Sequence, residues 1–179
     1  MTDSMRPSLG SVLLAALVVA VADLLDAIIV WVVIFQKSTV LRILQSIARG
    51  LLGQDAFKGG NATAALGLVL HFVVALGWTL VFVVLLLRWP RLRVWMATTR
   101  GAVLVGLVYG AVVWLLMDSI VLPLSRASFV PPTHPWFWIQ LATHPFVVGL
   151  PIALILRWGS RHVAAVTPAH LPQTARGNG

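Results

Sequence analysis

Four long apolar stretches constrain this chain more than any other feature of its sequence. They cover residues 9–35, 62–87, 101–124 and 136–156. At about 1.5 Å per residue, each is long enough to cross the roughly 30 Å hydrocarbon core of a bilayer as an α-helix. Only 10% of the 179 residues are charged, whereas soluble domains average about 25%. The sequence therefore predicts an all-α polytopic membrane protein, a bundle of four transmembrane helices.

The domain organisation follows from where the apolar stretches end. We expect residues 1–158 to form a single membrane domain. Residues 159–179 are polar and contain two prolines and several glycines and small residues, a composition typical of a disordered tail.

The first apolar stretch has a second interpretation, as a signal peptide. Arg6 precedes an apolar run that reaches Ala20-Val21-Ala22, the small-residue pattern of a cleavage site. Cleavage after Ala22 would remove the first span and leave Asp23 as the first residue. Apolar residues resume after Asp26, however, and the whole stretch is longer than the apolar core of a signal peptide. The spanning helix is the favoured interpretation.

The segment between the first two spans predicts an amphipathic helix. Its apolar residues recur at helical spacing, and the polar ones fall mostly on other faces. We expect this helix to end at Gly50 or Gly53, and to lie at the membrane interface or to cap the ends of the bundle. The apolar set is Val40, Leu41, Leu44, Ile47, Leu51 and Leu52, and the polar set is Lys37, Arg42, Gln45 and Arg49.

Basic residues predict the orientation of the chain. Four spans place both termini and the middle loop on one side, and that side collects more Lys and Arg than the other. Since positive residues are retained on the cytoplasmic side, we expect cytoplasmic termini in a bacterial inner membrane. The terminal side holds Arg6, Arg88, Arg91, Arg93, Arg100, Arg157, Arg161 and Arg176; the other side holds Lys37, Arg42, Arg49, Lys58 and Arg126.

Composition also limits the classes of binding partner that the chain can have. The net charge is +8, but the basic residues flank apolar segments, where orientation and anionic headgroups account for them. We therefore expect the lipid bilayer, and no nucleic acid, as the partner; a homo-oligomer is compatible with the sequence. The chain has no cysteine, which excludes disulfide chemistry, thiolate metal sites and iron–sulfur clusters.

Ionisable residues inside the spans are the candidate functional residues. A charged group near the bilayer centre costs roughly 2.5–3.5 kcal/mol on insertion scales, so each one needs a partner or a function. Counting from the loop-one side places them roughly 9–18 Å deep, in a single layer to which all four helices contribute. These residues are Asp23, Asp26, His71, Asp118 and His144, and Gln140 shares a helix face with His144.

Small residues predict how the third span packs. Gly106 and Gly110 are four residues apart, a spacing that allows close backbone approach between helices. Trp114 and Asp118 continue the same spacing. We therefore expect this stripe to turn Asp118 toward the interior of the bundle.

Three functions are compatible with the polar layer. The acids and histidines can hold the bundle together by hydrogen bonding to one another. They can form a binding cavity or proton relay for a small or lipidic ligand. Alternatively, His71 and His144 can hold a divalent metal or haem in a membrane enzyme or electron-transfer protein, although the Glu-x-x-His pairs of di-metal bundles are missing. The absence of a catalytic motif favours a non-enzymatic role, with enzyme activity left open.

Several segments of the chain resemble an uncharacterised family of small bacterial four-span inner-membrane proteins. They are QSIARGLLGQDAFKGG, ALGLVLHF, GLVYGAVVWLLMDSIVLPLS and HPFVVGLPIALIL, which lie between Gln45 and Leu156. The resemblance implies four membrane helices and makes Asp23, His71 and His144 family-like positions. It implies no activity, substrate or cofactor.

Overall fold

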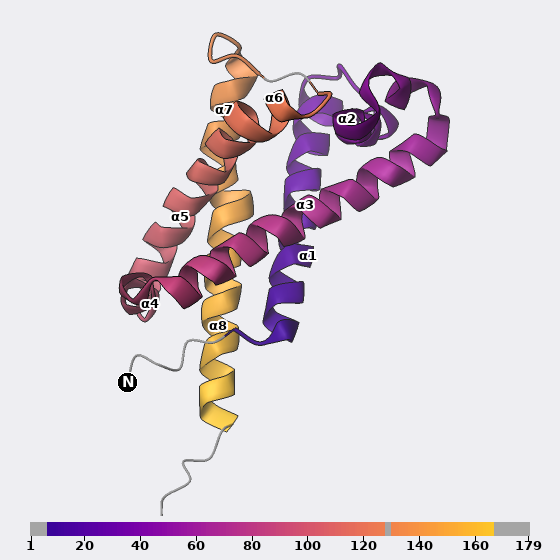
Figure 1. The fold of residues 1–179 in the computed structure, drawn as a ribbon. Helices are drawn as coiled ribbons and strands as arrows, with labels where there is room; N and C mark the ends of the chain where they lie inside the picture. Colours follow the sequence, from indigo (N-terminus) through magenta and orange to yellow (C-terminus); the bar gives the residue numbers. More distant parts are fainter. Residues whose placement is uncertain (1–6, 128–129, 167–179) are drawn as a thin grey trace, which may run out of the picture.

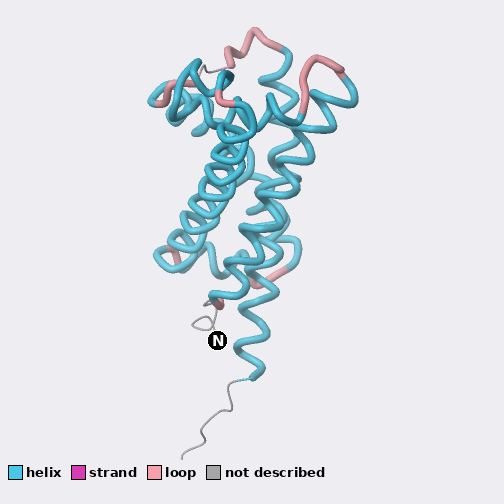
Figure 2. Tube along the Cα trace, turned by 90° about the vertical axis from the view of Figure 1, so that its right-hand side faces the viewer, coloured by secondary structure: helices cyan, strands magenta, loops and turns pink. Residues whose placement is uncertain are grey.

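The structure, a computed structural model, describes residues 7–127 and 130–166. Throughout those residues the chain is helical, without β-strands, and short loops join the helices (Figure 2). Four helical stretches are long and apolar enough to span a membrane: Leu9–Ile34, Gly60–Arg88, Thr99–Leu124 and Pro135–Arg161. Each overlaps one predicted span, so the prediction of an all-α chain with four helices of spanning length is confirmed.

Three of the four long helices contain a π-helical segment. The first is α1 (Leu9–Ile28) with η1 (Ile29–Ile34), the second is α3 (Gly60–Arg88), the third is α5 (Thr99–Leu116) with η3 (Met117–Val121) and α6 (Leu122–Leu124), and the fourth is α7 (Pro135–His144) with η4 (Pro145–Gly149) and α8 (Leu150–Val166). The connections hold α2 (Val40–Leu52), the 3-10 segment η2 (Gly53–Lys58) and α4 (Pro90–Met96).

The connecting elements lie at two opposite ends of the molecule. The start of α1 and the end of α8 lie at the same end as α4, and α2 and α6 lie at the other end (Figure 1). We call these the α4 end and the α2 end. This arrangement is the one expected of a chain that crosses the molecule four times.

Side-chain caps explain where several helices begin. The hydroxyl of Ser8 accepts a hydrogen bond from the backbone N–H of Ser11 at the start of α1, at 3.2 Å. Thr39 and Thr98 do the same for α2 and α5. At α7, the Nδ1 atom of His134 accepts from the N–H of Trp136, at 3.1 Å. Each cap satisfies a backbone donor that the first turn of a helix leaves unpaired.

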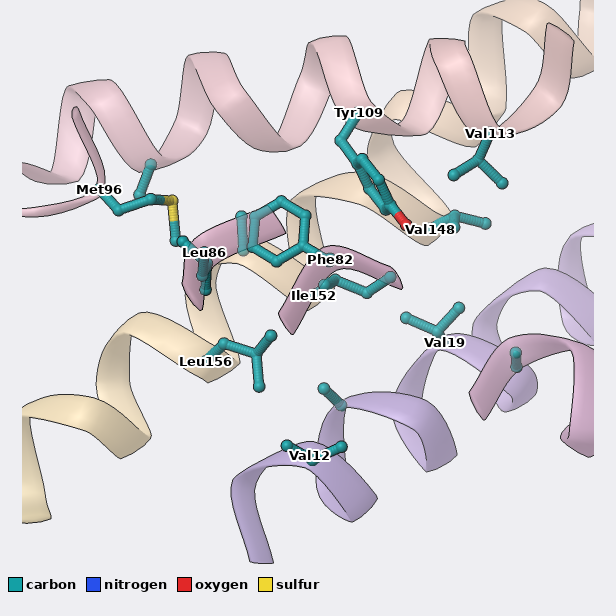
Figure 3. Close-up of a cluster of buried hydrophobic side chains, with 14 of the residues drawn as sticks. Val12, Val19, Phe82, Leu86, Met96, Tyr109, Val113, Val148, Ile152 and Leu156 are labelled. Atoms are coloured by element: carbon teal, nitrogen blue, oxygen red, sulfur yellow. The ribbon is translucent and has the colours of Figure 1, made fainter. Parts of the chain in front are cut away.

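The hydrophobic core lies between α1, α3, α5 and α8. α1 packs against both α3 and α8, and α5 packs against α7, η4 and α8. Phe82, from α3, meets the ring of Tyr109, from α5, with centroids 4.8 Å apart. The Tyr109 hydroxyl donates to the carbonyl oxygen of Trp78, at 2.6 Å. Figure 3 shows this core, in which Val12, Val19, Leu86, Met96, Val148, Ile152 and Leu156 are also buried.

Glycines bring α5 into backbone contact with η4. A Cβ atom on Gly110 would lie 2.5 Å from the carbonyl oxygen of His144 and 2.7 Å from the Cα of Pro145. A Cβ on Gly106 would lie 2.9 Å from the carbonyl oxygen of Gly149. No larger residue fits these positions without separating the two helices. The predicted close approach at Gly106 and Gly110 is confirmed, and the neighbour is η4.

The amphipathic segment forms α2, which ends at Leu52 and is followed by Gly53 with a φ of 66°. α2 packs on α3 where Gly67 leaves room for the backbone of Leu44 and Ala48. The buried side chains of α2 include polar Gln45, whose Nε2 donates to the carbonyl oxygen of Gly60, at 3.1 Å. Apolar side chains, by contrast, stay exposed: Val40, Leu41 and Leu51. The helix therefore covers the start of α3 and leaves part of its apolar face uncovered.

Two arginines at the α4 end bind helix carbonyls. The buried side chain of Arg157 donates to the carbonyl oxygens of Met96 and Ala97, at 3.0 and 3.1 Å. Arg93 donates to the carbonyl oxygens of Leu86 and Leu87, both at 3.0 Å. Cations are favourable at helix C-termini because the last carbonyls carry partial negative charge. These arginines therefore stabilise the ends of α3 and α4.

The fourth span continues farther than its sequence indicates. We placed the end of the membrane domain at residue 158 and a disordered tail from residue 159. α8 instead runs without a break to Val166, and the side chain of Ser160 is buried and donates to the carbonyl oxygen of Leu156, at 2.8 Å. The remainder of the expected tail, residues 167–179, lies outside the described residues.

A Gly110→Ala substitution tests the contact between α5 and η4. We expect it to lower the free energy of unfolding by about 1–3 kcal/mol, because the new methyl group overpacks a backbone contact. Gly77→Ala is the matched control, since a Cβ on Gly77 meets nothing within 4 Å. Equal stability of the two variants in denaturant titrations of the detergent-solubilised protein would contradict the packing described.

Candidate functional site: a polar centre between three helices

One carboxylate lies between two imidazoles from different helices. The Nε2 atom of His144 is 3.6 Å from Oδ1 of Asp23, and the Nε2 atom of His71 is 3.9 Å from Oδ2 of the same side chain. Asp23 comes from α1, His71 from α3 and His144 from the last residue of α7. The predicted polar layer thus brings these three residues together.

A second acidic residue extends the site toward the α2 end. Asp26 lies one turn farther along α1, and its Oδ2 accepts from the hydroxyl of Thr143, at 3.3 Å. The same hydroxyl is 3.4 Å from the side-chain oxygen of Gln140. Because α1 packs against η4, which directly follows His144, Asp26 can meet residues at the end of α7. We call Asp23, Asp26, His71, Gln140, Thr143 and His144 the polar centre.

Backbone carbonyls fix the proton positions of both imidazoles. The Nε2 atom of His71 lies 2.8 Å from the carbonyl oxygen of Ala20, and the Nδ1 atom of His144 lies 3.1 Å from the carbonyl oxygen of Gln140. A carbonyl oxygen can only accept, so each of these nitrogens must carry a hydrogen. The tautomers are thereby assigned from the hydrogen-bond partners.

The third span contributes an aromatic residue to the centre. The ring of Trp114, from α5, packs against the imidazole of His144 with centroids 4.9 Å apart. Trp114 is buried, and its indole Nε1 has no hydrogen-bond partner among the described residues. Trp114, which continues the spacing of Gly106 and Gly110, thus covers one face of His144.

Asp118 is buried, as expected, but its carboxylate binds a loop rather than a residue of the polar centre. Its buried carboxylate accepts from the backbone N–H of Val130, at 2.8 Å, and so holds the loop between α6 and α7. The physical reason is helix geometry: residues four apart drift by about 40° at each step. Three such steps separate Gly106 from Asp118, so the two residues do not share a face.

The carboxylate and imidazoles do not fit a metal or haem site in this arrangement. Nε2 of His71 carries the hydrogen bonded to Ala20 and so has no lone pair for a metal. Both imidazole Nε2 atoms face one carboxylate, whereas two axial haem ligands must face an iron atom between them. No group of three or more His, Cys, Asp or Glu residues within the described segments is placed to hold a metal ion.

The sequence analysis missed two contributors to the site. Thr143 links Asp26 to Gln140, and the carbonyl oxygen of Ala20 holds His71. Thr143 had a signal, because it lies three residues after Gln140 and directly before His144. Ala20 had no such signal, because it contributes a backbone carbonyl oxygen, which every residue carries. Ala20 also lies before the alternative cleavage point after Ala22, so the centre uses α1 on both sides of that point.

Replacing Asp118 tests its assignment to the loop. Asp118→Ala leaves the partly buried N–H of Val130 without its acceptor, and we expect a loss of about 1–3 kcal/mol in the free energy of unfolding. Asp118→Asn keeps an acceptor oxygen and should retain most of the stability. Comparable losses in both variants, measured by thermal unfolding in detergent, would show that the charge rather than the hydrogen bond matters.

Comparisons with protein-family models, with curated proteins and with solved structures find no match for this chain. The chemistry of the site must therefore be argued from its own residues. Those residues form a carboxylate–imidazole centre shared by α1, α3 and α7, inside helices long and apolar enough to span a membrane.

Proposed function

We propose that this chain is a non-enzymatic multi-pass protein of the bacterial inner membrane, with cytoplasmic termini, whose polar centre joins three of its four spanning helices into a bundle. The four long apolar helices support the membrane location. The excess of arginine near α4 and the termini supports the orientation. In this orientation, the polar centre lies in the periplasmic half of the bilayer.

The shared carboxylate of Asp23 is the observation that carries this proposal. Each of its oxygens faces an imidazole from a different helix. Polar side chains that meet between membrane helices stabilise helix association, because lipid offers them no alternative partner. A centre with partners on α1, α3 and α7 therefore favours one arrangement of those helices.

Two features favour binding of a small polar or lipidic ligand as a second function of the centre. The side chain of Asp23 keeps 27% of its surface exposed although it lies within a spanning helix. Nearby, the buried indole N–H of Trp114 lacks an acceptor. A molecule that donates to Asp23 and accepts from Trp114 would satisfy both groups.

In the proposed orientation, α2 lies on the periplasmic surface of the membrane. Its exposed apolar residues, Val40, Leu41 and Leu51, would contact lipid. Arg42 places its guanidinium over the ring of Phe57, 5.1 Å from the centroid, and remains able to reach headgroups. An amphipathic helix at the interface buries its apolar side in the same way.

Substitutions in the polar centre test its role in joining helices. We expect His71→Phe and His144→Phe each to lower the free energy of unfolding by about 1–2 kcal/mol, the range found for polar contacts between membrane helices. Phe146→Leu is the control, since Phe146 is 61% exposed and two residues from His144. The measurement is thermal unfolding of purified protein in detergent.

A double-mutant cycle sharpens this test. If Asp23 and His144 interact, Asp23→Leu combined with His144→Phe should cost less than the sum of the two single losses. Full additivity, together with unchanged stability of both histidine variants, would remove the support for a joining role.

The orientation can be tested by cysteine labelling, because the chain has no cysteine of its own. Gln54 lies after α2 and Ala97 lies after α4, and both are exposed. We expect Gln54→Cys to react with a membrane-impermeant maleimide in intact spheroplasts, and Ala97→Cys to react only after permeabilisation. The reverse pattern would invert the proposed topology.

A further inference from the structure

The hydrogen-bond pattern of His144 leaves one proton unaccounted for. Its Nδ1 atom donates to the carbonyl oxygen of Gln140. In a neutral imidazole with hydrogen on Nδ1, the Nε2 atom carries a lone pair and can only accept. That Nε2 atom lies 3.6 Å from Oδ1 of Asp23, and an ionised carboxylate is also an acceptor. Two acceptors would therefore face each other, one on a buried imidazole and one on a carboxylate that keeps 27% of its side chain exposed.

Neighbouring side chains do not supply the missing donor. The Nε2 hydrogen of His71 is used by the carbonyl oxygen of Ala20, which is 2.8 Å away, whereas Asp23 is 3.9 Å away. The Thr143 hydroxyl has one hydrogen and lies between Asp26 and Gln140. Among the described side chains none donates to this contact, so a proton between Asp23 and His144 would turn two facing acceptors into a hydrogen-bonded pair.

The surrounding charges strengthen the need for this proton. Two carboxylates of α1 lie near His144. Asp23 is beside its imidazole, and Asp26, one turn along the helix, accepts from the neighbouring Thr143. Two carboxylates three residues apart, without Lys or Arg beside them, attract a positive charge in a medium of low dielectric constant.

Other ionisable side chains on the elements around Asp23 and His144 bind partners outside this contact. Tyr109 of α5 donates to Trp78, and Asp118 of η3 accepts from Val130. η4 has no ionisable side chain. Arg157 of α8 binds carbonyls at the α4 end. His71, on α3, is the remaining titratable neighbour.

We propose that Asp23 and His144 together bind one exchangeable proton inside the membrane. This inference rests on the proposed function, because it names the proton as a ligand of the polar centre. The proton comes from water and forms one new bond, either to Nε2 of His144 or to Oδ1 of Asp23. The first form is an imidazolium–carboxylate pair and the second is a neutral O–H···N hydrogen bond. Both hold the same single proton, which belongs to the pair.

Proton binding is thereby coupled to the contact between α1 and α7. With the proton, Asp23 and His144 attract each other across the two helices. Without the proton, the lone pairs of Asp23 and His144 face each other. The carboxylates of Asp23 and Asp26 then have no positive charge beside them. Release of the proton therefore weakens the contact between the first and last spans on the α2 side of the molecule.

Nitrogen NMR of the full chain in lipid nanodiscs tests the proposal. The protein is labelled with ¹⁵N-histidine, and the His144 signals are identified by their loss in His144→Gln. We expect the Nε2 signal to move from the protonated or hydrogen-bonded range to that of a bare imidazole nitrogen, in one single-proton step, as the pH is raised from about 5 to about 9. Infrared spectra of the carboxyl stretch show whether Asp23 carries the proton.

Two Asp-to-Asn substitutions, which barely change side-chain size, distinguish proton binding by Asp23 and His144 from a general effect of removing a carboxylate. Asp23→Asn places an amide N–H where the proton would lie, so Nε2 should accept from it at every pH and the step should disappear. Asp26→Asn is the matched control on the same helix face and should retain the step.

Two results would overturn the proposal. One is an Nε2 signal that stays in a single state over this pH range in the unmodified protein. The other is a step that persists in Asp23→Asn. Either result leaves the joining role untouched, since that role is judged by the stability of the His71→Phe and His144→Phe variants.

Discussion

A carboxylate inside a lipid bilayer must find its partners within the protein, and Asp23 finds them on two other helices. Its two oxygens face imidazoles from α3 and α7, so the side chain is a contact point for three helices. The apolar core adds packing contacts but little hydrophobic driving force, because lipid and leucine side chains are equally apolar. The groups of the polar centre, by contrast, would lose their partners if the helices moved apart.

Close packing complements this polar contact on the opposite side of α7. Gly106, Gly110 and Gly149 let the backbones of α5 and η4 touch, and Trp114 of α5 lies against His144. The imidazole is therefore held by α1 on one side and by α5 on another. The π-helical turn that begins at Pro145 directly follows His144. Because proline has no N–H, it interrupts the regular hydrogen bonds of the helix at that point.

The number of long helices and the approximate limits of the first three spans were predictable, because the length of an apolar stretch determines them. The contact at Gly106 and Gly110 and the meeting of Asp23, His71 and His144 followed from spacing and depth. Asp118 was placed wrongly because a four-residue stripe drifts around a helix, and its partner is a loop N–H that no sequence pattern reveals. For the same reason, the carbonyl of Ala20 was beyond prediction. The end of the last helix was missed because polar residues there are held by helix backbone and by packing.

The contact between Asp26 and Thr143 joins residues 117 positions apart in the chain, and this separation has a consequence for biogenesis. A membrane protein is synthesised from its N-terminus, so α1 enters the bilayer while α7 has yet to be made. During that interval its two acidic residues lack Thr143 and His144. The last span to be inserted therefore completes the electrostatic environment of the first. A chain that stops before the last span would leave these two acids without those partners.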